Sequence, residues 1–294
     1  MTAQSDLVTS PTPHPLPKRT SDRVTHIRPE RGWLDLELDQ IWRFRGLLST
    51  LVHRDVMVLY RQAALGAAWA IIQPVFAVAI FTIVFSRIAK LPVPGDTPYP
   101  IFAFAAVLPW TYFAEAVRRG SSGLVNEANL VRKVYFPRIA IPLSGIIAPL
   151  IDFLLAFLVL IALMLLMGVM PTWRLFIVFP LILVASMMAL AISLWLAPIN
   201  VRFRDVKYTL TFMLQIWMYA SPVVYSSSMV PEKWRWVYAL NPMVGVIDGF
   251  RWAVTGVGQP NFVALGIGST LIAIMLAGGL IFFKRLERTF ADII

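Results

Sequence analysis

R-D-V-M-V-L-Y-R-Q-A-A-L-G-A-A-W-A-I-I-Q-P, residues 54–74, is the stretch that decides the fold. Its first part carries charged side chains, but after Gly66 no charged residue occurs until Arg87. The apolar run 67–85 approaches the roughly 20 helical residues that cross a hydrocarbon core of about 30 Å. A long amphipathic helix entering a soluble core is the alternative. Five further apolar runs favour a membrane span instead.

The segment before this span has the pattern of a basic amphipathic helix. At about 100° per residue, one helical line carries Arg43, Thr50, Arg54 and Arg61, and the opposite line carries Ile41, Leu48, Val52 and Leu59. We therefore predict an N-terminal amphipathic helix within residues 33–66 that lies along the membrane surface.

The composition indicates an integral membrane protein. Hydrophobic residues make up 58% of the 294 residues and charged residues only 14%, whereas soluble domains carry about 25% charged residues. The chain has no cysteine, and its three histidines, His14, His26 and His53, precede the first span. No disulfide and no thiolate or histidine metal site is expected in the spans. The net charge of +10 favours anionic lipid headgroups, rather than nucleic acid, as a partner.

Six apolar runs predict an all-α protein with six transmembrane helices. The runs are 67–85, 99–117, 143–169, 176–199, 210–225 and 264–283. With the N-terminus inside, the inner segments hold 9, 5, 3 and 3 of the 26 lysines and arginines, and the outer segments hold the other 6. This distribution places both termini in the cytoplasm. A seventh span through 243–257 is disfavoured, because Asp248 and Arg251 lie in a run that is already too short.

The rest of the domain organisation follows from proline and charge. Residues 1–32 hold five prolines and scattered basic residues, and we predict a disordered cytoplasmic tail without a cleavable signal peptide. The transmembrane domain is predicted over 67–284 and a cytoplasmic C-terminus over 285–294. Prolines inside the runs are interpreted as kinks rather than helix ends; they are Pro74, Pro109, Pro149, Pro180 and Pro198.

Two connections are longer than a simple loop. In the inner one, 118–141, Asn126 is expected to cap a helix of two to three turns that stops at Phe136-Pro137. Its polar residues are Asn126, Glu127, Asn129, Arg132 and Lys133. The pattern fits a helix with a functional role and, equally well, a solvated surface helix or one that rests on lipid headgroups.

In the outer connection, 226–263, Pro231 is expected to start a helix over 232–240, and Asn241-Pro242 a second helix that ends at Gly256. We call these two helices the outer helix pair. The first carries Trp234, Trp236 and Tyr238. The pair is too short to span, so it either anchors in the interface as an aromatic belt or forms an outer gate over a pore. The length of the insertion favours the gate.

Motifs for catalysis are absent from the sequence. No G-x-x-x-x-G-K-[ST], G-x-S-x-G or H-E-x-x-H occurs, so neither a Walker A loop nor these hydrolase sites are expected. Within the spans the ionisable residues are Glu115 and Asp152. Two carboxylates make a poor proton relay, and a structural role is favoured for both.

Aromatic residues are the more informative feature of the spans. Sugar rings stack their C–H faces on aromatic rings, while tyrosine hydroxyls and tryptophan N–H groups supply hydrogen bonds. Candidates to line a channel for a glycan are Trp69, Phe76, Trp110, Tyr112, Phe113, Trp217, Tyr219 and Tyr225. For any one of them, a lipid-facing or core position is the alternative.

Four segments together resemble the permease subunit of bacterial polysaccharide exporters of the type-2 ABC class. They are R-D-V-M-V-L-Y-R-Q-A-A-L-G with W-A-I-I-Q-P (54–74), L-V-N-E-A-N-L-V-R-K-V-Y-F-P-R (124–138), N-V-R-F-R-D-V with S-P-V-V-Y (200–206 and 221–225), and A-L-N-P-M (239–243). The resemblance covers about residues 40–284 and excludes the proline-rich tail. This family exports O-antigen, capsule and teichoic-acid chains.

The resemblance implies a homodimer of six-span halves in the bacterial inner membrane, with a nucleotide-binding subunit beneath each half. ATP and its Mg²⁺ would bind to those partners, and this chain would hold no cofactor. Residues 126–135 would form the coupling helix on the ATPase, 38–61 the interface helix and 231–255 the outer gate helices. The substrate would be a polysaccharide on a polyprenyl diphosphate carrier. Arg54 and Arg61 are candidates to receive the diphosphate, although the positive-inside rule alone also places arginines there.

Other functions are compatible with parts of this pattern. A type-2 ABC permease for a small hydrophobic or lipid-like substrate would share the same spans. A membrane transferase acting on polyprenyl-linked sugar should show clustered carboxylates at one face, and the outer loops offer only Asp96, Glu232 and Asp248. Sparse intramembrane charge disfavours an ion-coupled transporter.

Overall fold

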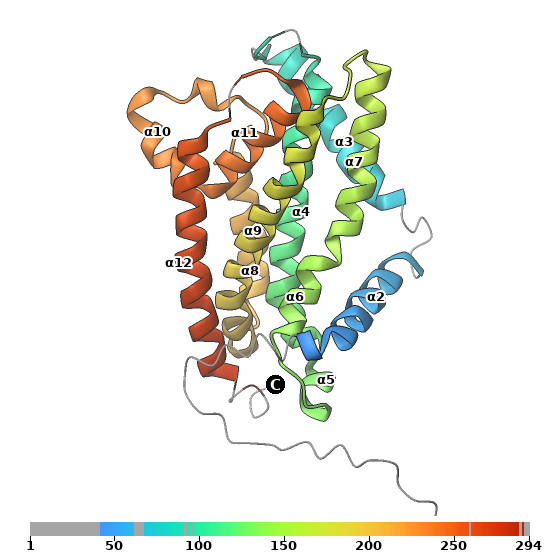
Figure 1. Cartoon of the computed structure of the whole chain (residues 1–294), viewed down its shortest axis with the longest axis vertical. Coiled ribbons are helices and arrows are strands. Elements are labelled where there is room, and N and C mark those ends of the chain that lie inside the picture. The colour runs from blue at the N-terminus through green and yellow to red at the C-terminus, as the bar shows by residue number, and fades with distance from the viewer. Residues whose placement is uncertain are drawn as a thin grey trace, which may run out of the picture. The chain divides into compact units, whose positions relative to one another are not determined.

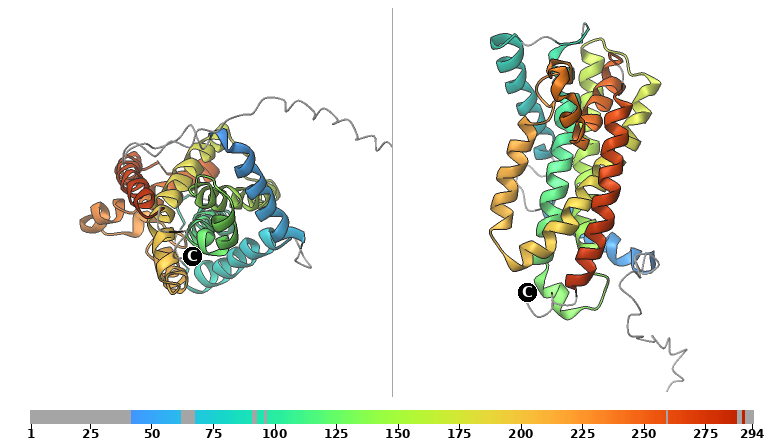
Figure 2. Two further views of the ribbon diagram at one scale, coloured as in Figure 1. Left: turned by 90° about the horizontal axis from the view of Figure 1, so that it is seen from below. Right: turned by 90° about the vertical axis from the view of Figure 1, so that its left-hand side faces the viewer.

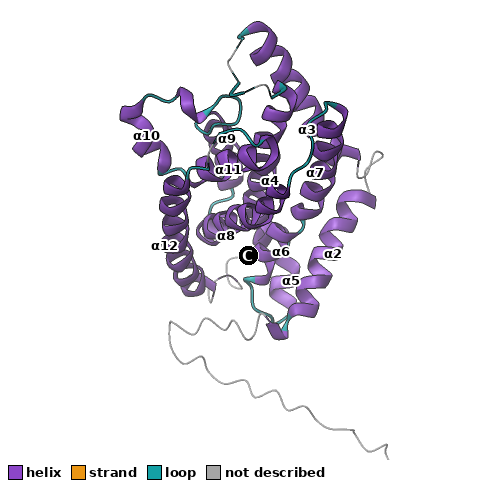
Figure 3. Ribbon diagram, turned by 45° about the horizontal axis from the view of Figure 1, so that its top comes forward, coloured by secondary structure: helices purple, strands orange, loops and turns teal. Residues whose placement is uncertain are grey.

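The computed structural model describes residues 42–61, 68–90, 93–95, 97–258, 260–287 and 290. All of them belong to one compact unit, Leu36–Ile294. Every regular element in this described part is helical, as Figure 3 shows, so the all-α prediction is confirmed there. The predicted tail, the ends of the 33–66 segment and most of the predicted 285–294 C-terminus lie outside the described residues.

The helices follow one another along the chain with short connections. The first half contains α2 (Arg45–Arg61), α3 (Ala68–Phe81), the π-helical η1 (Thr82–Ile88), α4 (Tyr99–Asn126), α5 (Ala128–Lys133), α6 (Ala140–Ile147) and α7 (Pro149–Leu166). The second half contains η2 (Trp173–Ile177), α8 (Val178–Arg202), α9 (Val206–Tyr219), η3 (Ser227–Met229), α10 (Glu232–Ala239), α11 (Pro242–Thr255) and α12 (Phe262–Glu287).

Five helical segments in the described part are long and apolar enough to cross a membrane. They correspond to the first four predicted runs and the sixth. The fifth run forms α9, which has 14 residues and is therefore only about 21 Å long at about 1.5 Å per residue. Beyond it the chain continues through 220–226 without regular helix, and Ser221, Val223 and Val224 are buried there. Five of the six predicted spans are thus present as full-length helices.

Three of the five prolines in the predicted runs lie inside a helix, as predicted, whereas Pro149 stands at the start of α7. Helical backbone runs through Pro74 in α3, Pro109 in α4 and Pro198 in α8. Between α6 and α7, Ala148 keeps helical dihedral angles (φ −57°, ψ −44°), and Pro149 occupies the first position of α7. A proline at that position loses no hydrogen bond that the helix would otherwise make.

Helix α4 is the centre of the bundle. It packs against α3, α6, α7, α8, α9 and α11, and most of its residues are buried. Small residues allow the closest approach: a Cβ built on Gly145 of α6 would lie 2.8 Å from the backbone nitrogen of Gly120, and one on Gly120 would lie 2.4 Å from Ser193 Oγ. Close packing over glycine and serine is typical of helices that associate within a membrane.

The helices also define two ends of this unit. In Figure 1, α2, α5 and the C-terminal end of α12 lie at one end, and α10 and α11 lie at the other. A second apolar cluster packs at the α5 end, where Leu51 of α2 meets Val131 of α5, Ile141 of α6 and Phe283 of α12. Both α3 and α9 contact α4, and in the right-hand view of Figure 2 they lie on the same side of it.

Candidate functional site

A bidentate ion pair joins helix α2 to Glu127, which lies between α4 and α5. Arg54 donates from Nη1 to Glu127 Oε2 at 2.8 Å and from Nη2 to Glu127 Oε1 at 2.6 Å, and its Nη2 also donates to Asp55 at 2.9 Å. Ser144 of α6 donates to the other Asp55 oxygen at 3.4 Å. Burial opposes the guanidinium charge, but these carboxylates outweigh it and raise the pKa of Arg54. The geometry makes α2, α5 and α6 one connected unit.

The helix predicted within 33–66 is present as α2, and its position along a membrane surface stays a prediction. Leu47 and Leu51 of α2, with the preceding Phe44, pack into the apolar cluster at the α5 end. Arg54 is about one turn beyond Leu51, and its contacts with Glu127 leave it partly buried, whereas Arg43 is exposed. The side chain of Arg61 lies outside the described side chains.

The inner connection differs in its boundaries from the prediction. Helix α4 continues to Asn126, so Asn126 ends that helix and does not cap the next one; Glu127 occupies the cap position of α5, which has only six residues. Val131 is buried, whereas four of the five predicted coupling residues, Asn126, Asn129, Arg132 and Lys133, are exposed. Tyr135 is 80% exposed. A polar surface with one large aromatic ring therefore faces outward at this end.

The predicted channel aromatics separate into two groups. Trp110, Tyr112 and Phe113 of α4 are buried within the chain. The Tyr112 hydroxyl contacts Ser186 Oγ at 2.5 Å, so it ties α4 to α8. Trp217 of α9 packs on α4, with its ring centroid 5.5 Å from that of Phe113 and 6.4 Å from that of Trp110. These aromatic rings fasten α9 to the centre of the bundle.

The other group is exposed on the flank formed by α3 and α9. Trp69 is 53% exposed and Phe76 64% exposed on α3, and Tyr219 is 55% exposed on α9. Tyr225 lies after α9, where its hydroxyl donates to the Tyr219 carbonyl at 3.2 Å. Large aromatic surfaces are thus exposed on both helices of this flank.

The outer helix pair forms where the sequence predicted it. Asn241 caps α11 by accepting a hydrogen bond from the Met243 N–H at 3.1 Å, and Gly256 ends α11 with a left-handed φ of 70°. Trp234 and Trp236 of α10 are exposed. Tyr238 donates to the Tyr225 hydroxyl at 3.0 Å, which connects α10 to the segment after α9.

Arg251 of α11 is the main anchor of this pair, and it is only 5% exposed. It donates to the carbonyls of Tyr225 at 2.8 Å, Val223 at 2.9 Å and Phe102 at 3.4 Å, and its guanidinium lies 3.7 Å from the Phe102 ring centroid. We call these contacts the Arg251 network. They hold α11 to α4 and to the irregular segment that follows α9.

Comparison with known protein families gives a match that covers the segments carrying these contacts. The family model described as ABC-2 type transporter matches residues 46–255, which is most of the chain and contains the ion pair, the exposed aromatic flank and the Arg251 network. The chain belongs to the ABC-2 type transporter family. The family match, together with five apolar helices of spanning length, makes it a multi-pass membrane protein.

Individual ABC-2 relatives match over most of their own length. The O-antigen export system permease protein RfbA of Myxococcus xanthus is 30% identical over 215 residues, which cover 72% of this chain and 81% of that protein. The protein of the same name from Klebsiella pneumoniae is 26% identical, with 84% and 95% covered. The polysialic acid transport protein KpsM of Escherichia coli is 24% identical, with 82% and 92% covered. The resemblance seen in the sequence is thereby confirmed.

Two features of this ABC-2 chain were not assigned from sequence. Glu115 is paired within α4: Arg119 Nε donates to it at 2.5 Å and Arg118 donates to its other oxygen. The two arginines follow Glu115 by three and four residues, the spacing at which side chains meet on a helix, so the sequence did indicate these pairs. Arg251 follows the buried Ile247 by one turn and precedes the buried Val254 by another. An arginine on the apolar face of a short helix indicates a buried network.

Proposed function

We propose that this chain is the permease of an exporter that moves a polysaccharide, linked to polyprenyl diphosphate, across the bacterial inner membrane. A separate ATPase subunit supplies the energy. The observation that carries this proposal is the similarity, over most of both chains, to permeases named for O-antigen export and polysialic acid transport. The absence of a Walker A sequence supports a partner that binds ATP and Mg²⁺.

In this proposal two copies of the chain form the passage, with the α3 and α9 flanks facing each other. The exposed Trp69, Phe76 and Tyr219 then present aromatic surface to a passing glycan. Helix α9 and the irregular segment 220–226 together complete a sixth crossing. Both termini lie in the cytoplasm, as the distribution of lysine and arginine predicts.

In this proposal the ATPase subunits act on the chain at the end that contains α5. One ATPase subunit docks beneath each copy on the exposed residues of the inner connection, among them Asn129, Arg132 and Lys133. ATP binding closes the two ATPase subunits and displaces α5. The outer helix pair, with Trp234, Trp236 and Tyr238, acts as the gate at the opposite end.

Deleting the gene for this chain tests the proposal directly. Polysaccharide should disappear from the cell surface and accumulate inside as lipid-linked polymer, and a plasmid copy should restore export. The purified chain should hydrolyse no ATP alone and should copurify with an ATPase. Unchanged surface polymer in the deletion strain, together with a defect in the efflux of a small hydrophobic dye, would favour the alternative of a small-molecule permease.

Reversing the Arg54–Glu127 ion pair separates two roles for Arg54. Arg54→Glu is expected to reduce export at least about fivefold, because it places three carboxylates together at the α2–α5 junction. The double variant Arg54→Glu with Glu127→Arg should regain most of the export, since the pair re-forms with reversed polarity. The measurement is surface polymer at matched expression, beside the ATPase rate of the purified complex.

The same experiment tests Arg54 as a diphosphate contact. If Arg54 and Arg61 receive the diphosphate, the double reversal cannot restore export, because it leaves a carboxylate where the phosphate binds. The pair itself contributes only about 1 kcal/mol to stability, since both side chains are partly exposed. Melting temperatures of all variants should therefore stay close to that of the wild type.

A further inference from the structure

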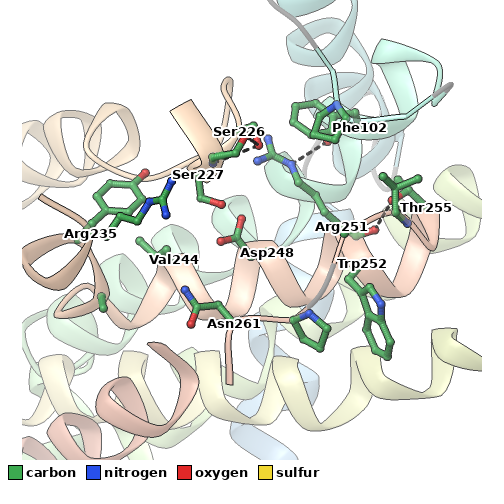
Figure 4. A pocket seen from close by; sticks show the side chains of 17 residues that line it. Phe102, Ser226, Ser227, Arg235, Val244, Asp248, Arg251, Trp252, Thr255 and Asn261 are labelled. Carbon is green, nitrogen blue, oxygen red and sulfur yellow. Dashed lines mark hydrogen bonds between the residues drawn. The ribbon is translucent and has the colours of Figure 1, made fainter. Parts of the chain in front are cut away.

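A cavity of about 550 Å³ lies beneath the outer helix pair. Its walls come from the turn 226–228, from α10 and α11, and from the connection between α11 and α12 (Figure 4). The polar lining side chains are those of Ser226, Ser227, Ser228, Arg235, Tyr238, Asp248, Arg251, Thr255 and Asn261. The volume falls within the roughly 300–1,000 Å³ that is typical of small-molecule sites.

The Arg251 network fixes one wall of this cavity. The guanidinium directs its donors to the carbonyls of Val223, Tyr225 and Phe102. Asp248 makes no ion pair with it within 4.0 Å among the described residues. Figure 4 shows the Asp248 carboxylate pointing between Ser227 and Asn261, while the Arg251 guanidinium points toward Phe102. The carboxylate is therefore left to face the cavity.

Two further groups in the cavity have hydrogen-bonding capacity beside Asp248. Asn261 Oδ1 accepts the Ala264 N–H at the start of α12, at 3.0 Å, and this bond leaves the amide NH₂ as a pair of donors. The Ser227 hydroxyl lies beside the Asp248 carboxylate (Figure 4). The carboxylate has about four lone-pair sites in all, so acceptor positions remain for a ligand.

The chemistry of this lining selects a neutral polyhydroxyl ligand. Arg235 and Arg251 also line the cavity, but their donors go to backbone carbonyls and to Glu232. Asp248 is therefore the charged lining group with hydrogen-bonding positions left for a ligand, and it favours hydroxyl donors over an anion. A metal ion is disfavoured, because the described residues contain no group of three or more histidine, cysteine, aspartate or glutamate side chains. Vicinal hydroxyls of a sugar can donate to both carboxylate oxygens and accept from an amide. Aromatic rings of Phe102, Tyr238 and Trp252 also line the cavity and suit the C–H face of a sugar ring.

We infer that this cavity is a saccharide-binding subsite that takes one or two neutral sugar residues at the α10–α11 end of the chain. Asp248 accepts hydrogen bonds from ring hydroxyls, and the Asn261 amide donates to a neighbouring one. This inference rests on the proposed function and extends it, because it assigns a place where the polymer is held after leaving the membrane core.

The test uses the full chain in lipid nanodiscs and a panel of methyl glycosides of glucose, galactose, mannose, rhamnose and N-acetylglucosamine. Saturation-transfer difference NMR should detect binding of at least one glycoside to the wild type. The signal should fall at least about fivefold in Asp248→Asn, which is isosteric but replaces one carboxylate acceptor by an amide donor. It should fall similarly in Asn261→Asp, which keeps the cap of α12 and removes the amide donors.

Glu232→Gln is the matched control, since it removes an equal charge from the same helix pair at a side chain that is 88% exposed. Its signal should equal that of the wild type, and melting temperatures verify that all variants are folded. Absence of binding to the wild type overturns the inference, as does a signal unchanged in both cavity variants. Native mass spectrometry that finds a phospholipid held through Asp248 would also overturn it.

Cellular export separates this inference from the proposed function. If the deletion strain loses surface polymer but no glycoside binds, the subsite is wrong and the proposed function stands. If surface polymer is unaffected by the deletion while glycosides bind in an Asp248-dependent way, the subsite stands and the proposed function is wrong.

Discussion

Replacing Arg251 by methionine is expected to lower the melting temperature of the detergent-purified chain by roughly 10 °C and to abolish export. Methionine fills much of the same volume but leaves the carbonyls of Val223, Tyr225 and Phe102 without their donor. A buried acceptor left without its donor costs about 1–3 kcal/mol, so three unpaired carbonyls cost at least about 3 kcal/mol in total. The outer helix pair would then separate from α4, and limited proteolysis should cut between α9 and α10.

Two further variants make the Arg251 prediction specific. Arg235→Met removes an exposed arginine of the same helix pair, whose bonds to Val230 and Glu232 are both 3.4 Å long, and should shift the melting temperature by less than about 2 °C. Arg251→Lys keeps the charge but reaches fewer carbonyls, so an intermediate loss is expected. Equal melting temperatures for Arg251→Met and Arg235→Met would refute the anchoring role.

Gly145→Val is expected to prevent the chain from accumulating as a folded protein. A Cβ on Gly145 would lie 2.8 Å from the Gly120 backbone nitrogen and 2.9 Å from the Arg119 carbonyl carbon. Backbone atoms of α4 cannot rotate away as a side chain does, so α6 would have to shift. We expect a cost of at least about 3 kcal/mol, measured as a lower melting temperature and as loss of the monodisperse peak in size-exclusion chromatography.

Gly266→Val in α12 is the matched control, because no atom lies within 4 Å of a Cβ at that position. Its stability should change by no more than about 0.5 kcal/mol. A Gly145→Val protein as stable as the control would mean that α4 and α6 do not approach as closely as the described packing requires.

Local sequence signals predicted much of the fold. The outer helix pair followed from Pro231, from Asn241-Pro242 and from Gly256, because caps and turn residues act within a few positions of the helix end. The apolar runs also located five full-length spans, because the hydropathy of a span is likewise set by consecutive residues. The length of α9 was overestimated, since the apolar segment 220–226 packs without helical backbone and composition does not distinguish these two states.

Pairings between distant segments were beyond sequence reasoning. Arg54 and Glu127 are 73 positions apart, and Arg251 and Tyr225 are 26 apart. Helical periodicity placed Trp110 and Phe113 on one face of α4, but whether that face is buried depends on how α9 packs there. The exposed positions of Trp69 and Phe76 depend on tertiary packing in the same way. The residues near these aromatics in the sequence do not determine whether each ring is buried or exposed.

Helix α4 extends without interruption from Tyr99 to Asn126, a length of about 42 Å. At one end the Tyr99 hydroxyl donates to the Val224 carbonyl at 3.0 Å, and the next residue past the other end is Glu127, which holds Arg54. A single helix therefore connects the α2–α5 end and the α10–α11 end of this unit. If an ATPase subunit displaces α5 as proposed, α4 offers a path of continuous helical backbone from Asn126 to Tyr99, and from there to the segment after α9, with Pro109 inside it.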